Sequence, residues 1–139
     1  MLRSLFAIIG GYITFAVGLA LANRVVVLVV PSLIAEGPSS SRFIVTSLVC
    51  AGMMGTLGGF MAGLIAGREP RMHGVILAVV CALYFLLFLG APTPPGEAIF
   101  PVWYKIGLLV VVPPAVTIGG FLRSYQKSAA GTEEPLPSK

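Results

Sequence analysis

The chain has 139 residues, of which 57% are hydrophobic and only 10% are charged, and its formal net charge is +4 at pH 7. A soluble domain carries about 25% charged residues, so this composition excludes a surface covered by charge and exposed to water. The mean hydropathy is +0.98, and the apolar residues fall in long blocks, which favours lipid as the solvent. The composition therefore predicts an integral membrane protein without a soluble catalytic domain.

Four apolar blocks have the length of about 20 residues that a helix needs to cross a bilayer. Backbone groups in lipid must pair within the protein, which leaves helices as the structure for blocks of this length. The sequence predicts an all-α, four-helix transmembrane bundle in residues 1–123, with helices at about 5–30, 43–67, 72–91 and 99–122. Residues 124–139 are polar and are predicted to form a disordered cytoplasmic tail.

The basic residues predict the orientation of the bundle. Cytoplasmic loops carry an excess of Lys and Arg, and in a four-span arrangement six basic residues lie on one side and three on the other. Both termini are therefore predicted to lie inside, with Trp103 and Tyr104 at the outer interface. The basic residues on the inner side are Arg3, Arg68, Arg71, Arg123, Lys127 and Lys139, and those on the outer side are Arg24, Arg42 and Lys105.

The first apolar block has a second interpretation as a cleavable signal peptide. Arg3, an apolar core and the sequence Ala20-Leu21-Ala22 fit that pattern. However, the apolar core from Leu5 to Ala22 is longer than the roughly 7–15 residues of a usual signal-peptide core. We therefore expect an uncleaved first helix, whereas cleavage would leave three spans.

Small residues recur every four positions in the second helix. Lipid gives helices no hydrophobic reason to associate, so close approach of two backbones across small residues must hold them together. Packing within one bundle is the first interpretation, and a homo-oligomer interface or a sliding gate is the second. The candidate packing residues are Gly55, Gly59, Gly63 and Gly67 with Ala51 on the second helix, Gly10 and Gly18 with Thr14 and Ala22 on the first, and Gly74 on the third.

The short turn at residues 68–72 makes the second and third helices antiparallel neighbours. We therefore expect Gly63 and Gly67 to meet Gly74 and Ala78 near the cytoplasmic face.

Arg24 is the most unusual charge, because it lies within an apolar block. A rise of 1.5 Å per residue places it roughly 28 Å along the helix from Leu5, close to the outer interface. It either extends its side chain to the headgroups or is held between helices. In the second case it contacts an anionic lipid headgroup or pairs with Glu36 or Glu97.

The remaining polar residues predict no catalytic, metal or cofactor site. All five acidic residues are glutamates outside the apolar blocks, and no nucleophile–base arrangement is visible. His73 is the only histidine and is expected to be an interfacial or capping group, although a pH-sensing role with Glu69 stays open. Pro113-Pro114 are expected to kink the fourth helix, and Cys50 and Cys81 to fill space as small apolar residues.

The stretch from Gly58 to Arg68, followed by His73-Gly74, resembles a pattern found in uncharacterised small four-helix bacterial membrane proteins. In these proteins a glycine-rich helix ends in basic residues, and the next helix opens with glycine. The resemblance covers roughly residues 52–90 and implies a multi-pass protein of the bacterial cytoplasmic membrane. It carries no known activity, so it assigns no site residue.

The sequence favours a non-catalytic protein that acts through helix–helix contacts, as an accessory subunit or a homo-oligomer. Its expected partners are the lipid bilayer and a further copy of itself or another membrane protein. Nucleic acid is not expected, because the basic residues are scattered rather than clustered. A small channel or carrier formed by oligomerisation is the alternative, with Arg24 near its outer mouth.

Overall fold

The structure of the chain, a computed structural model, describes residues 2–35, 40–91 and 100–131. Its elements are α1 (Leu2–Val29), α2 (Ser32–Ala35), α3 (Ser41–Ala66), α4 (Pro70–Gly90) and α5 (Val102–Gly131). All but α2 are long and apolar enough to cross a membrane, and the described residues contain no strand. The predicted all-α bundle of four membrane-spanning helices is therefore confirmed.

The fourth long helix extends further than the sequence analysis expected. The predicted end at Leu122 is wrong, because α5 continues to Gly131 and so includes the start of the segment predicted to be disordered. Arg, Gln, Lys and Ala in this extension are good helix formers, and Lys127 Nζ donates a hydrogen bond to Gly67 O over 2.7 Å. Residues 132–139, the rest of the predicted tail, lie outside the described residues.

Local chemistry fixes the ends of α3 and the start of α4. Ser40 is the N-cap of α3 and accepts a hydrogen bond from Phe43 N over 3.3 Å, which satisfies one free N–H of the first turn. The helix ends at Gly67, which has a φ of 68° that glycine adopts without strain. Pro70 then begins α4, where its missing N–H costs nothing.

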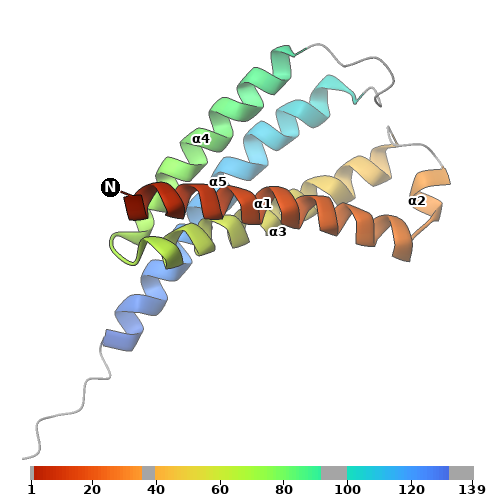
Figure 1. The fold of residues 1–139 in the computed structure, drawn as a ribbon. Helices are drawn as coiled ribbons and strands as arrows, with labels where there is room; N and C mark the ends of the chain where they lie inside the picture. The colour runs from red at the N-terminus through yellow and green to blue at the C-terminus, as the bar shows by residue number, and fades with distance from the viewer. Residues whose placement is uncertain (1, 36–39, 92–99, 132–139) are drawn as a thin grey trace, which may run out of the picture.

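The long helices form two pairs that diverge (Figure 1). α1 packs along α3, α4 packs along α5, and α3 and α5 pack against each other between them, while α1 and α4 touch little. The N-terminus lies beside the α3–α4 turn, and we call this the turn end of the bundle. The pairs separate toward the opposite end, which carries α2 and the C-terminus of α4, and we call this the open end (Figure 1).

Apolar side chains from all four long helices form the core. Its largest fully buried members are Ile44, Leu77, Val112 and Val116, with Cys81 among them. The outward faces are also apolar, as expected of surfaces that contact lipid.

One buried polar pair crosses the core, where Ser47 Oγ and Tyr104 Oη lie 3.1 Å apart and share a hydrogen bond. Tyr104 is 8% exposed, so it belongs to the core, whereas its neighbour Trp103 is 46% exposed. Tyr104 therefore turns into the bundle and Trp103 away from it, while their level at the outer interface stays a prediction. Its hydroxyl finds a partner in Ser47, which makes burial of this polar group tolerable.

Candidate functional site

The small residues that recur every four positions along α3 form two columns, and both columns lie inside the bundle. The column that contains Gly55 and Gly59 faces α5, because a Cβ on Gly59 would overlap the carbonyl oxygen of Val116. A second column of small residues on α3, which contains Gly58 and Ala62, faces α1, because a Cβ on Gly58 would lie 2.8 Å from Gly11 O. Both faces are therefore covered by helices of the same chain, which leaves no glycine face of α3 free for a second copy.

Two adjacent glycines of α5, which the sequence analysis did not select, complete these contacts. A Cβ on Gly119 would overlap Thr56 O of α3, and a Cβ on Gly120 would lie 2.9 Å from the Cα of Gly74 in α4. The Gly119-Gly120 pair in the sequence could have indicated these contacts. Neighbouring positions on a helix point to different sides, so two adjacent glycines can each allow close approach of a different helix.

On α1 the close contact lies one position away from the expected column. Ala7, Gly11 and Phe15 are buried, whereas Gly10 and Gly18 are only half-buried. A Cβ on Gly10 would meet the tip of Ile65, and one on Gly18 would meet the Met54 sulfur. Flexible side-chain ends can move, so Gly10 and Gly18 do not set the distance between the backbones.

The expected contact of Gly63 and Gly67 with Gly74 is not present. A Cβ on Gly63 would lie 3.0 Å from the Cβ of Pro70, and the space beside Gly67 holds the Arg3 guanidinium. The nearest atoms to a Cβ on Gly74 belong to Gly120. The reason is that α4 leaves α3 shortly after the turn and packs along α5 instead.

Basic side chains tie three segments together at the turn end. Arg3 Nε donates to Ile65 O over 3.1 Å, and Arg71 Nε donates to Ser124 Oγ over 2.8 Å. The guanidinium of Arg71 also lies 5.3 Å from the centroid of the Phe121 ring. The N-terminus, the α3–α4 turn and the end of α5 therefore share one end, while the side of the membrane that this end faces stays a prediction.

Arg24 lies on an exposed part of α1 near the open end. Within the part of the chain that the structure describes, no hydrogen bond or ion pair holds it, and its proposed partners Glu36 and Glu97 lie outside that part. The preceding residue, Asn23, has a buried Oδ1 atom without a hydrogen-bond partner there. Both interpretations of Arg24 therefore stay open.

Replacing Arg24 separates these interpretations. If the side chain only reaches the headgroups, Arg24→Lys should leave the melting temperature unchanged, because an ammonium on a flexible stem reaches them too. If a planar guanidinium grips a carboxylate or phosphate, Arg24→Lys should be as damaging as Arg24→Ala. We expect the first result, measured by thermal unfolding in detergent, and equal losses for the two variants would contradict it.

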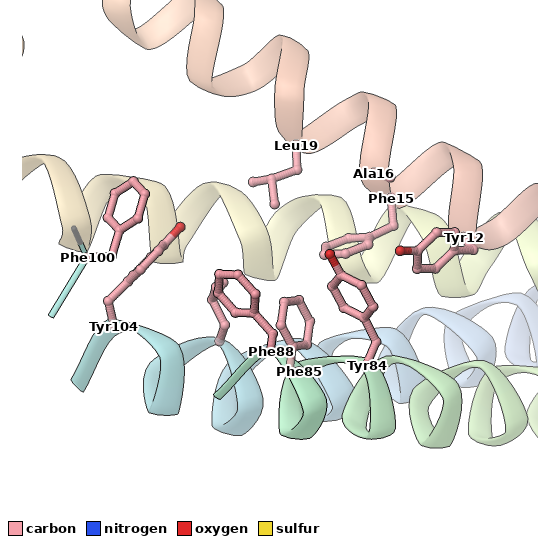
Figure 2. A pocket seen from close by; sticks show the side chains of 10 residues that line it. Tyr12, Phe15, Ala16, Leu19, Tyr84, Phe85, Phe88, Phe100 and Tyr104 are labelled. Carbon is pink, nitrogen blue, oxygen red and sulfur yellow. The ribbon is translucent and has the colours of Figure 1, made fainter. Parts of the chain in front are cut away.

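A cavity lies between α1, α4 and the start of α5, in the half of the bundle toward the open end. Its volume is about 270 Å³. In Figure 2, Leu19 and Phe15 point from α1 toward the rings of Tyr84, Phe85 and Phe88 on α4. The complete lining is Tyr12, Phe15, Ala16, Leu19, Tyr84, Phe85, Phe88, Phe100, Tyr104 and Leu108, and we call this the aromatic cleft.

Ring contacts stiffen the walls of the aromatic cleft. Tyr12 and Tyr84 meet edge to face across it with their centroids 6.1 Å apart, and Phe15 and Phe85 do so at 6.3 Å. On α4, Tyr84 stacks on Phe88 at 6.5 Å. Offset and edge-to-face pairs are the favoured geometries of aromatic rings, so these contacts hold α1 and α4 apart at a defined separation.

The size of the side chains along α4 changes from the turn end to the open end. Near the turn end α4 presents Gly74 and Ala78, both buried, and these allow close packing. Further along it presents Tyr84, Phe85 and Phe88, which line the cleft. Gly74 packs against Gly120 of α5, whereas the aromatic rings further along lie between α4 and α1, where the two pairs diverge in Figure 1.

The histidine, cysteines and prolines considered in the sequence analysis lie in helices of the bundle. His73 Nδ1 lies 3.1 Å from Glu69 O, one turn earlier, and Cys81 is buried while Cys50 is half-buried. α5 runs through Pro113 and Pro114 as one helix. Among the described residues, no group of three or more His, Cys, Asp or Glu side chains could hold a metal ion.

No family model, no curated protein and no solved structure matches the chain. The site is therefore interpreted from its own geometry.

Proposed function

We propose that the chain is a non-catalytic integral membrane protein that acts through contacts between helices, as an accessory subunit or a homo-oligomer. The observation that supports this is the low burial of α1. Only 17% of an 18-residue apolar stretch of α1 is buried, against 28% to 33% for the corresponding stretches of the other three long helices. A helix with so little cover inside its own bundle has the most surface left for a partner.

The outer face of α1 suits such a contact. Ile9, Ile13 and Val17 form a ridge at intervals of four residues, with exposed fractions of 44%, 54% and 52%. Ridges at this spacing pack into the grooves of a neighbouring helix. Because the glycine columns of α3 are covered inside the bundle, this ridge takes the place of the glycine interface considered from the sequence.

Cysteine cross-linking tests the ridge. In a background without Cys50 and Cys81, Ile13→Cys should form an intermolecular disulfide in the membrane, because equivalent positions meet across a symmetric helix pair. Leu87→Cys is the matched control, since Leu87 is 76% exposed on α4 but belongs to no ridge of α1. Cross-linking at both positions alike, or a purified monomer without any stoichiometric partner, would contradict the proposal.

A small channel or carrier formed by oligomerisation is the second proposal. The observation that favours it is the polar pair Asn23 and Arg24 on α1, where Asn23 Oδ1 is buried without a partner in the described structure. If copies meet along α1, these two side chains lie near that contact. Ion or solute flux into proteoliposomes, lost on Arg24→Ala, would replace the first proposal by this one.

A further inference from the structure

We propose that the aromatic cleft binds one acyl chain of an anionic phospholipid, whose phosphate is held by Lys105 at the open end. The cleft lies within the part of the bundle that faces lipid tails, and Ala16 and Tyr84 on its rim are exposed. The inference concerns a different surface from the outer ridge of α1 and does not depend on it.

The volume of the cleft decides between a lipid chain and a helix as occupant. An engineered apolar cavity of about 150 Å³ binds benzene, so 270 Å³ is ample for a segment of hydrocarbon chain. A helix is about 10 Å across and rises 5.4 Å per turn, so a single turn takes roughly 400 Å³. The cleft therefore has room for a hydrocarbon chain but not for a whole turn of a partner helix.

The cleft runs along α1 from Tyr12 to Leu19, which is about 10 Å at 1.5 Å per residue. It ends at the Tyr12–Tyr84 ring pair, beyond which a second cavity begins, and Tyr12 lies about 15 Å along α1 from Leu2 at 1.5 Å per residue. This distance is about half of the 30 Å hydrocarbon core. The other end reaches Phe100 and Tyr104, at the start of α5. A chain segment that enters at the open end therefore reaches the tyrosine pair near the middle of the membrane.

The walls offer such a chain contacts that the protein does not make by itself. Rigid rings cannot collapse into the space between them, and an unfilled gap loses the dispersion energy of the atoms that line it. A flexible acyl chain recovers these contacts without a hydrogen-bond partner. Because the lining is largely aromatic and aliphatic, the occupant is an apolar chain rather than a polar metabolite.

Lys105 places a positive charge at the mouth of the cleft. Its Nζ atom lies 4.8 Å from the centroid of the Phe88 ring, which lines the cleft. It donates to Phe88 O and Ala91 O, both over 3.4 Å. An ammonium has three donors, so two long bonds to carbonyl groups leave one for a phosphate oxygen. The charge and the apolar cleft together fit a lipid with an anionic headgroup.

Native mass spectrometry of the full chain, purified in detergent and supplied with phosphatidylglycerol or phosphatidylcholine, tests the proposal. The unmodified chain should retain one phospholipid, with phosphatidylglycerol preferred. Ala16→Trp should abolish retention by filling the cleft. Ala20→Trp is the matched control and should retain the lipid, because Ala20 is an equally exposed alanine one turn further along α1 and does not line the cleft.

The charge is tested by a variant that leaves the cleft walls intact. Lys105→Gln should reduce the preference for phosphatidylglycerol about fivefold, which corresponds to about 1 kcal/mol for one basic side chain near a membrane surface. Lys127→Gln, at the turn end, should leave the preference unchanged. If Ala16→Trp fails to fold, this pair of lysine variants still decides the headgroup.

Three results would overturn the proposal. The first is an unmodified chain that retains no phospholipid, and the second is equal retention by Ala16→Trp and Ala20→Trp. The third is a doubled mass that only Ala16→Trp returns to the monomer, which would make a second copy the occupant of the cleft.

Discussion

Gly59→Ala is expected to destabilise the bundle by about 3 kcal/mol, the upper end of the usual cost of overpacking. The added methyl group would overlap the carbonyl oxygen of Val116. That atom belongs to the backbone of α5, so no side-chain rotation relieves the overlap and the two helices must separate. Gly119→Ala should cost a similar amount, because it overlaps Thr56 O on the opposite helix.

Trp103 is the only tryptophan, so its fluorescence can report unfolding in a detergent titration. Gly90→Ala is the matched control, because nothing lies within 4 Å of the added methyl group, and it should change the unfolding free energy by less than about 0.5 kcal/mol. If Gly59→Ala is tolerated as well as Gly90→Ala, the α3–α5 contact does not hold the bundle together.

The number of membrane helices could be predicted because it depends on the length of apolar blocks alone. The end of α5 could not, because the polar extension after residue 122 forms a helix through composition and the Lys127 contact rather than through hydropathy. The orientation of the bundle in its membrane stays a prediction that depends on the basic residues.

The glycine columns were visible in the sequence, but their partners were not. A spacing of four fits Gly10 and Gly18 as well as it fits Ala7, Gly11 and Phe15, and only the packing distinguishes the two sets. Phe15 belongs to the buried set because it fills the space beside Gly58, where a Cβ would lie 3.0 Å from the Cβ of Phe15.

The aromatic cleft was also beyond the reach of the sequence. Its walls combine residues from three helices that are distant in the chain, and its width depends on how far α1 and α4 diverge. The rings lie where α1 and α4 separate, and the glycines hold each helix to a particular neighbour. The positions of these contacts and rings in the bundle depend on which helices are neighbours, and the sequence does not show this.

Gly11→Ala should destabilise the protein by about 1–3 kcal/mol. The added methyl group would lie 2.8 Å from Gly58 O, 2.7 Å from the Ala62 Cβ and 2.7 Å from a methyl carbon of Leu77. One backbone atom and two buried side chains therefore resist it at once, from both α3 and α4.

Gly10→Ala is the matched control on the neighbouring residue. The added methyl group would meet only the tip of Ile65, which can rotate, and alanine favours a helix over glycine by up to about 1 kcal/mol. Gly10→Ala should therefore be neutral or slightly stabilising in the same detergent titration. The contrast between two adjacent glycines removes any general effect of adding a methyl group to this helix.

The same pair of variants bears on whether the first helix remains in the mature protein. If a signal peptidase removed it after Ala22, neither Gly11→Ala nor Gly10→Ala could alter the stability of the purified chain, and its intact mass would show the loss. We expect the full mass and a difference between the two variants, because Phe15 of α1 belongs to the buried core with Leu77. A bundle without α1 would expose that part of the core to lipid, and α3 would lose the backbone contact at Gly58.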